Sequence, residues 1–352
     1  MGKKRVLVCD DSALMRKLLR EIIESDPSFE VVDTARDGEE AVLKARQLRP
    51  DVVTMDINMP RMDGLTALQI IVEEEICPVI MVSSLTQDGA VATFQALELG
   101  AFDYVAKPGG TISRDIGVVR DELIAKLKAA TKVNVRRLAT KVTKVSTVSL
   151  GKQLPGETVG DFFAVAIGIS TGGPKTIYEV LPPLPQNLNA AVFLVQHMPP
   201  EFTRQYAERL DKYCKLKVVE AEDDMLVQPG VVYVGKGGYH LKLKKRGKDL
   251  RIFLSTLPPC MFMPSVDVMM ESVLEHFGPK TVGVLMTGMG SDGAEAMRKI
   301  HEAGGYTIAE SEETAIVFGM PQEAIRRGGA KKVLPSHDIA REIIRVVGLR
   351  SE

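Results

Sequence analysis

The apolar positions of the chain follow two alternating spacings from Arg5 onward. Short runs of consecutive apolar residues predict buried strands at residues 5–11, 29–35, 51–56, 77–84 and 104–110. Between them, residues 13–25 and 38–48 have apolar side chains at helical spacing and charged side chains elsewhere. Because strands and helices alternate, this part of the sequence predicts a parallel, doubly wound sheet.

A second alternation begins near Phe162. It predicts strands at residues 163–170, 190–200, 231–235, 281–293 and 306–311, and helices at 174–184, 200–213, 266–277 and 293–304. Between Val231 and Ser255, glycine-containing breaks separate alternating segments, which predicts an antiparallel hairpin inserted into the pattern. The fold class expected for the whole chain is therefore α/β, with two doubly wound parallel-sheet domains.

The two patterns are joined by a segment without acidic residues. Residues 126–152 carry only basic charges, and a stretch containing glycine and proline follows. We interpret residues 125–155 as a linker between a domain at 1–124 and a domain at 156–352. A solvated connector is the simpler explanation of its charge, and attraction to an acidic surface is the alternative.

Charge, apolar content and cysteine positions argue against several functional classes. The formal net charge is −1 and no apolar run approaches the length of a membrane span, so we expect neither nucleic-acid binding nor membrane insertion. The start of the chain turns acidic too soon for a signal peptide, which favours a cytoplasmic location. Cys9, Cys77, Cys214 and Cys260 form no CxxC pair, so neither a disulfide framework nor a cysteine metal site is expected.

The predicted strands of the first domain end in polar side chains. The first strand finishes in Asp10 and Asp11, the third in Asp56, the fourth in Ser83, and the fifth in Lys107 and Pro108. Ligands bind at the carboxyl ends of such strands, and three converging carboxylates favour Mg²⁺ with oxygen ligands. A carboxylate can also accept a phosphoryl group, which Lys107 would neutralise and Ser83 could hydrogen-bond.

These strand ends lie within motifs that identify a family. The segments VCDDSALMRKLL, DVVTMDINMPRMDGL, VIMVSS and GAFDYVAKP closely resemble the receiver domain of two-component response regulators. The resemblance implies a flavodoxin-like fold in which Asp56 is phosphorylated. It also implies that Mg²⁺ is held by Asp10, Asp11, Asp56 and the backbone carbonyl of Asn58, and that the phosphorylation switch involves Ser83, Tyr104 and Lys107.

The second domain contains a serine in a glycine-rich turn. GISTG at residues 168–172 has the spacing of a nucleophile elbow, but Ser170 is equally placed to cap a helix, or to belong to a phosphate-binding loop. A dinucleotide site would need an acidic residue at the end of the second strand, where this chain has His197. Asp292 follows a later strand, so a Ser–His–Asp triad is favoured, with His240 as the rival base.

The motifs around these residues also indicate a family. GISTGGP, QHMPPEFT, MPSVDVM and VLMTGMGSDGA closely resemble the catalytic domain of chemotaxis receptor methylesterases, a Rossmann-like α/β domain that follows a receiver domain. The resemblance implies hydrolysis of glutamate methyl esters on methyl-accepting chemoreceptors and deamidation of certain glutamines, with no cofactor for hydrolysis. A chemotaxis histidine kinase would be the phosphodonor. The implied roles are nucleophile for Ser170, base for His197, orienting carboxylate for Asp292, and oxyanion-binding backbone amides for Thr171 and Met289.

Two other functional classes compete with this interpretation. A DNA-binding response regulator would need a basic recognition helix, and the second half of the chain shows none. A binding module that has lost catalysis would keep the fold without the triad, whereas all three triad residues are present. The architecture further predicts that the receiver restrains the esterase and that phosphorylation releases it.

Overall fold

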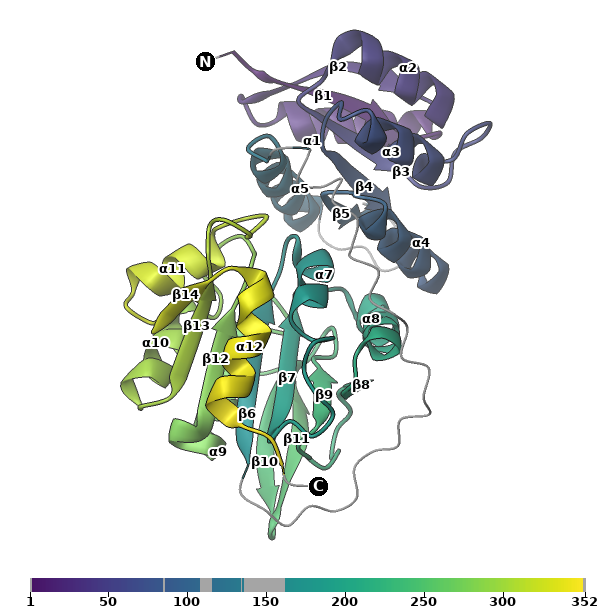
Figure 1. The fold of residues 1–352 in the computed structure, drawn as a ribbon. Coiled ribbons are helices and arrows are strands. Elements are labelled where there is room, and N and C mark those ends of the chain that lie inside the picture. Colours follow the sequence, from purple (N-terminus) through teal and green to yellow (C-terminus); the bar gives the residue numbers. More distant parts are fainter. Residues whose placement is uncertain (1, 85, 108–115, 134, 136–161, 351–352) are drawn as a thin grey trace. The chain divides into compact units, whose positions relative to one another are not determined.

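The structure is a computed structural model that describes residues 2–84, 86–107, 116–133, 135 and 162–350 (Figure 1). The chain divides into two compact units, Met1–Thr143 and Lys144–Glu352. Each unit has its own parallel sheet, and the two are described separately below. Most of the predicted linker lies outside the described residues.

The first unit is a five-stranded parallel sheet with strand order β2-β1-β3-β4-β5. This is the doubly wound order of flavodoxin-like folds, and it reverses between β1 and β3. Its strands are β1 (Lys4–Cys9), β2 (Phe29–Ala35), β3 (Val52–Asp56), β4 (Val79–Ser83) and β5 (Asp103–Ala106). Its helices are α1 (Ala13–Glu24), α2 (Gly38–Leu48), α3 (Gly64–Glu73), α4 (Gln87–Glu98) and α5 (Ile116–Ala130).

Side-chain caps explain where the helices of this unit begin. Ser12, Asp37, Asp63 and Thr86 each accept a hydrogen bond from a backbone N–H in the first turn of α1, α2, α3 and α4, respectively. Such caps satisfy amides that have no partner within the helix. The loops before α1 and α2, at residues 10–12 and 36–37, are short. Because the strands are parallel, the polar residues at their carboxyl ends lie at one edge of the sheet.

The second unit contains a seven-stranded parallel sheet with strand order β14-β13-β12-β6-β7-β9-β8. Its strands are β6 (Phe163–Ile169), β7 (Ala190–Gln196), β8 (Lys217–Glu220), β9 (Val231–Val234), β12 (Thr281–Leu285), β13 (Tyr306–Glu310) and β14 (Lys332–Leu334). Its longer helices are α8 (Pro200–Tyr213), α9 (Val266–Phe277), α10 (Ala294–Glu302), α11 (Met320–Arg326) and α12 (Ser336–Val347). The chain places β7 on one side of β6 and β12 on the other, so the order reverses beside β6.

The predicted hairpin is present in this unit. β10 (His240–Arg246) pairs with β11 (Asp249–Ser255) in an antiparallel register, and its apolar side chains Leu241, Leu243 and Ile252 join a core cluster with α9 and α10. Hydroxyl Oγ of Ser272 on α9 accepts a hydrogen bond from Leu243 N at 2.9 Å. The hairpin is therefore anchored to α9, the helix whose N-terminus lies at the candidate site.

A glycine on β6 allows α9 to approach the sheet closely. A Cβ at Gly168 would lie 2.2 Å from Cγ1 of Val266, the first residue of α9. Such a distance is too short for any side chain, so only glycine permits this packing. The N-terminus of α9 is consequently held next to the strand that Ser170 directly follows.

Several sequence predictions need correction. The helix expected at residues 174–184 is only α7 (Gly173–Thr176) followed by a 3₁₀ turn at Ile177–Glu179, because Pro182 and Pro183 cannot continue a helix. The strand expected at 281–293 ends at Leu285, before the glycine-rich turn that starts at Gly288. The segments predicted above include neither β8, β14, α11 and α12 nor, in the first unit, α3, α4 and α5.

Other features of the structure concern the four cysteines, the start of α9 and the length of the helices. Cys9, Cys77 and Cys214 are buried, whereas Cys260 is exposed. Asp267 lies in the first turn of α9. No helix among the described residues is both long and apolar enough to span a membrane.

Candidate functional site

Ser170, His197 and Asp292 follow the ends of three adjacent strands. β6 pairs with β7 on one side and with β12 on the other, so residues after β6, β7 and β12 meet at one edge of the sheet. Oγ of Ser170 lies 3.1 Å from Nδ1 of His197, and Nε2 of His197 lies 2.8 Å from Oδ2 of Asp292. The structure therefore brings together all three residues that the sequence predicted as a triad.

The carboxylate of Asp292 is held at the N-terminus of α9. Its oxygens accept hydrogen bonds from Val266 N at 2.7 Å, Asp267 N at 3.0 Å and the Ser265 hydroxyl at 2.8 Å. Burial opposes its ionisation, but the hydrogen bond and charge of His197 and these backbone amides lower the pKa of Asp292 well below its usual value. An ionised Asp292 fixes Nε2 of His197 as the donor and leaves Nδ1 free to accept a proton from Ser170.

The turn after β6 presents Ser170 without using its side chain as a cap. The N-cap of α7 is Gly172, in a left-handed conformation (φ 79°), and no side chain caps the helix. The capping interpretation of Ser170 is therefore wrong. Ser170 is fixed instead through its backbone, which donates from N to Thr287 O at 2.9 Å and accepts at O from Gln196 Nε2 at 3.0 Å.

The backbone amides of Thr171 and Met289, which the sequence resemblance implies as oxyanion-binding groups, lie in the loops after β6 and β12. Within residues 162–350, no hydrogen bond from the N–H of Thr171 or Met289 is found. Gly288 precedes Met289, and a Cβ there would lie 2.8 Å from Cβ of Ser170, so glycine is required for the two loops to approach. Both amides belong to loops that meet at Ser170.

The ring of His197 has an aromatic neighbour that the sequence did not indicate. Phe262, in the loop before α9, stacks on it with ring centroids 4.2 Å apart and an interplanar angle of 8°. The rival base His240 is fully buried, and both its ring nitrogens are used: Nε2 lies 2.8 Å from Pro258 O, and Nδ1 accepts from Ser265 N at 3.1 Å. His240 thus holds the loop and the start of α9 in place.

Asp267 links the N-termini of two helices around Asp292. Its Oδ1 accepts from Ala296 N in the first turn of α10 at 2.8 Å, which supplies a cap that Gly293 lacks. Burial raises the pKa of Asp267 to about 6, and the nearby charge of Asp292 contributes. Among the site-supporting residues, Ser265 and Asp267 carried a sequence signal, since both types favour the first turn of a helix.

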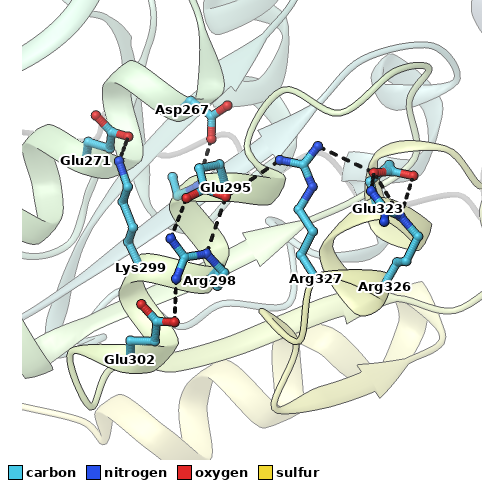
Figure 2. Close-up of polar contacts among 10 residues, drawn as sticks. Asp267, Glu271, Glu295, Arg298, Lys299, Glu302, Glu323, Arg326 and Arg327 are labelled. Atoms are coloured by element: carbon cyan, nitrogen blue, oxygen red, sulfur yellow. Dashed lines mark hydrogen bonds and ion pairs between the residues drawn. The ribbon is translucent and has the colours of Figure 1, made fainter.

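Ion pairs join α9, α10 and α11 on the outer side of this packing (Figure 2). Lys299 of α10 pairs with Glu271 of α9 at 2.6 Å, and within α10 Arg298 pairs with Glu295 at 2.5 Å. Arg327, directly after α11, lies 3.7 Å from Glu295. Exposed ion pairs of this kind contribute only about 0–1 kcal/mol each to folding stability. The buried contacts of α9 and α10 therefore do more to fix the positions of the site residues.

The acidic residues of the first unit also converge. Asp10, Asp11 and Asp56 each offer a carboxylate oxygen within 4.8 Å of the others. Lys107 Nζ lies 2.8 Å from Asp56 Oδ2 and 3.0 Å from Asp10 Oδ2, and the latter oxygen is buried without a hydrogen bond of good geometry. Burial raises the pKa of Asp56, against the opposing effect of Lys107. This hard-oxygen donor set fits Mg²⁺.

The other residues predicted for this unit lie at the end of β4 (Ser83), on β5 (Tyr104) and just after β3 (Asn58). Ser83 is buried and its hydroxyl accepts from Thr93 Oγ1 at 2.8 Å. Tyr104 is buried, with Lys126 Nζ 5.0 Å from its ring centroid. Asn58 is exposed, two residues beyond Asp56.

The fold and these arrangements define a class of protein: a flavodoxin-like unit with an acidic cluster, followed by an α/β unit with the Ser–His–Asp arrangement of serine hydrolases. Residues 6–113 match the response regulator receiver domain family, and residues 165–343 match the CheB methylesterase family.

Curated relatives resemble the whole chain. The protein-glutamate methylesterase/protein-glutamine glutaminase 3 of Syntrophomonas wolfei is 59% identical, over 97% of this chain and 99% of that protein. The corresponding protein of Caldanaerobacter subterraneus is 49% identical over 99% of this chain and 98% of its own length. The crystal structure of the Thermotoga maritima CheB methylesterase catalytic domain is 42% identical, with a TM-score of 0.52, over 53% of this chain and 99% of that chain. The chain therefore belongs to the protein-glutamate methylesterase/protein-glutamine glutaminase family and is an enzyme with an N-terminal receiver domain.

Proposed function

We propose that this enzyme hydrolyses methyl esters of glutamate side chains on methyl-accepting chemoreceptors, and deamidates receptor glutamines, through an acyl-enzyme on Ser170. The observation that carries the proposal is the pair of hydrogen bonds from Ser170 to His197 and from His197 to Asp292. A serine hydroxyl becomes a good nucleophile only when a base takes its proton and a carboxylate orients that base.

The reaction follows from these positions. Ser170 Oγ attacks the ester carbonyl carbon while Nδ1 of His197 takes its proton. Asp292 stabilises the resulting imidazolium through Nε2, and the Thr171 and Met289 amides bind the oxyanion. The imidazolium then protonates the leaving methoxide, and methanol departs.

Water completes the cycle. It attacks the acyl-enzyme with His197 as base, which releases the glutamate carboxylate and restores Ser170. A primary amide forms the same tetrahedral oxyanion and releases ammonia instead of methanol, so the same residues serve glutamine deamidation. None of these steps calls for a cofactor.

Methanol release from methylated chemoreceptor tests this assignment. Ser170→Ala and His197→Ala should each lower kcat by about 10⁵-fold or more, and the double variant should be no worse, because the two act as one unit. His301→Ala, an exposed histidine on α10, should behave as wild type. Near wild-type turnover by either single variant would exclude the triad.

For the first unit we propose that Asp56 accepts a phosphoryl group from a chemotaxis histidine kinase, and that this controls the esterase. We assign residues 1–124 to the receiver, 125–155 to the linker and 156–352 to the catalytic domain. Mg²⁺ held by Asp10, Asp11, Asp56 and the Asn58 carbonyl would neutralise charge on the transferring group. An oxygen of Asp56 bonds to phosphorus as the bond to the donor breaks, and Lys107 lies where it can pair with the phosphoryl oxygens.

Phosphorylation can be tested with acetyl phosphate and Mg²⁺. We expect an acid-stable, alkali-labile label that Asp56→Asn abolishes, because an amide is no nucleophile for phosphoryl transfer. Asp121→Asn, at an exposed position on α5, should label normally. Phosphorylated wild type should release methanol faster than unphosphorylated protein, and an equal rate would contradict control by Asp56. Ser83 and Tyr104 are the residues through which we expect the phosphorylated state to differ.

A further inference from the structure

Glu310 is a buried carboxyl beside the candidate active site. It ends β13, which pairs with β12, and its side chain is fully buried. Among the described residues, no lysine or arginine forms an ion pair with it. Burial raises the pKa of Glu310 to about 7, and the charge of Glu179 adds to the shift. Burying a carboxyl without a cation is costly, so the residue needs a reason to be there.

Two hydrogen bonds hold the Glu310 carboxyl in one orientation. Oε2 accepts from Thr287 N at 2.8 Å, and Oε1 accepts from Thr314 Oγ1 at 2.9 Å. Thr314 Oγ1 in turn accepts from Ser336 N at the start of α12 at 2.9 Å. The carboxyl therefore bridges α12 and the loop after β13 to the end of β12.

Thr287 connects the Glu310 carboxyl to the loop after β6, which contains Ser170 and Thr171, and itself belongs to the loop after β12. Its carbonyl accepts from Ser170 N at 2.9 Å, and its hydroxyl donates to Thr171 O at 2.9 Å. The same hydroxyl accepts from Val317 N at 2.9 Å. Thr287 is fully buried and lies two residues before Met289. Among the described residues, Glu310 is the only hydrogen-bond partner of the Thr287 N–H.

We propose that Glu310 is a positioning residue for ester hydrolysis: through Thr287 it fixes the Ser170 loop relative to the Thr171 and Met289 amides. The inference rests on the proposed roles of those three residues. Glu310 acts as a hydrogen-bond acceptor and not through its charge, because Thr287 N needs only one oxygen. A glutamine in its place keeps that oxygen and can donate to Thr314.

Two variants at this position distinguish the hydrogen-bond acceptor role of the Glu310 side chain from the effects of its charge and its volume. Glu310→Gln should keep kcat for methanol release within about 3-fold of wild type. Glu310→Leu keeps the approximate volume but leaves Thr287 N unpaired, and should lower kcat about 30-fold or more with KM within 3-fold. Glu312→Leu, at an exposed position two residues on, is the matched control and should retain wild-type kcat. The melting temperature of each variant is measured alongside.

A third variant keeps the test decisive if Glu310→Leu does not fold. Thr314→Val removes one of the two bonds that hold the carboxyl and should lower kcat about 3- to 10-fold at constant KM. A folded Glu310→Leu, or a Thr314→Val, with wild-type kcat would overturn the positioning role. So would a 30-fold loss in Glu310→Gln, which would mean that the charge matters. Failure of the proposed function is distinguishable, because Ser170→Ala would then retain methanol release whatever the Glu310 variants do.

Discussion

Replacing Asp292 by asparagine perturbs one atom of the proposed triad, and the structure predicts how the protein accommodates it. The carboxylate accepts two hydrogen bonds at Oδ2, from His197 Nε2 and Val266 N, and two at Oδ1, from Ser265 Oγ and Asp267 N. An amide has one oxygen, so its NH₂ group must face one of these pairs of donors.

The two orientations of the amide differ in cost. With NH₂ in place of Oδ2, His197 must move its proton to Nδ1 and can no longer accept from Ser170. With NH₂ in place of Oδ1, the Ser265 hydroxyl can rotate and accept, and only Asp267 N loses its partner. We therefore expect the second orientation, which keeps the productive tautomer of His197 but removes the negative charge.

The magnitude follows from the lost charge. Opposite charges about 4 Å apart at an effective dielectric of about 20 attract by roughly 4 kcal/mol, which corresponds to about 10³-fold in rate. The unpaired amide of Asp267 adds a loss of stability of about 1–3 kcal/mol. Asp292→Asn should thus lower kcat about 10³-fold while remaining folded.

Steady-state methanol release from methylated receptor and urea denaturation measure the two quantities. Asp338→Asn, in the first turn of α12 and away from the triad strands, serves as the control and should match wild type in kcat. A folded Asp292→Asn with kcat within 10-fold of wild type would refute the role assigned to the carboxylate.

Three further predictions concern neighbouring residues. Phe262→Ala removes the ring stacked on His197 and should lower kcat about 2- to 10-fold, since such contacts are worth about 0.5–1.5 kcal/mol; an unchanged kcat would mean that the stack does not restrain the base. Asp267→Ala removes the cap of α10 and should cost about 1 kcal/mol in urea denaturation, whereas no loss would contradict a capping role. Glu310 has a raised pKa, so unfolding releases its proton between about pH 4.5 and 7, and wild type loses stability relative to Glu310→Gln as pH rises through this window. Between pH 4.5 and above pH 7, the free energy of unfolding of wild type should fall by about 3 kcal/mol relative to that of Glu310→Gln. If the difference between the two free energies of unfolding does not change with pH, Glu310 ionises normally.

Much of the fold follows from apolar spacing, and the exceptions have physical causes. β1, β3 to β7, β9, β12 and β13 are largely buried strands whose apolar runs dominate the local pattern, and β2 is buried at Phe29, Val31 and Ala35. β14 is three residues long at the edge of the sheet and half exposed, so it carries no such run. α12 does have a usable signal, because Ile339, Ile343 and Val347 recur at four-residue intervals on its buried face.

The candidate site was predictable where its residues end strands. Ser170, His197 and Asp292 could be grouped because parallel strands share one carboxyl edge. Phe262 and Thr287 could not, because their contacts depend on how a loop folds and on which strands are neighbours. Glu310 also ends a strand, but its role appears only once β13 is known to pair with β12.

The central claim is that Ser170 is a nucleophile activated by His197 and Asp292. The most direct measurement is reaction of the full-length protein with a fluorophosphonate, followed by mass-spectrometric mapping of the adduct. We predict a single adduct on Ser170 that is lost in Ser170→Ala and forms at least 10³-fold more slowly in His197→Ala. An adduct on another serine, or labelling of Ser170 at an unchanged rate in His197→Ala, would contradict the account.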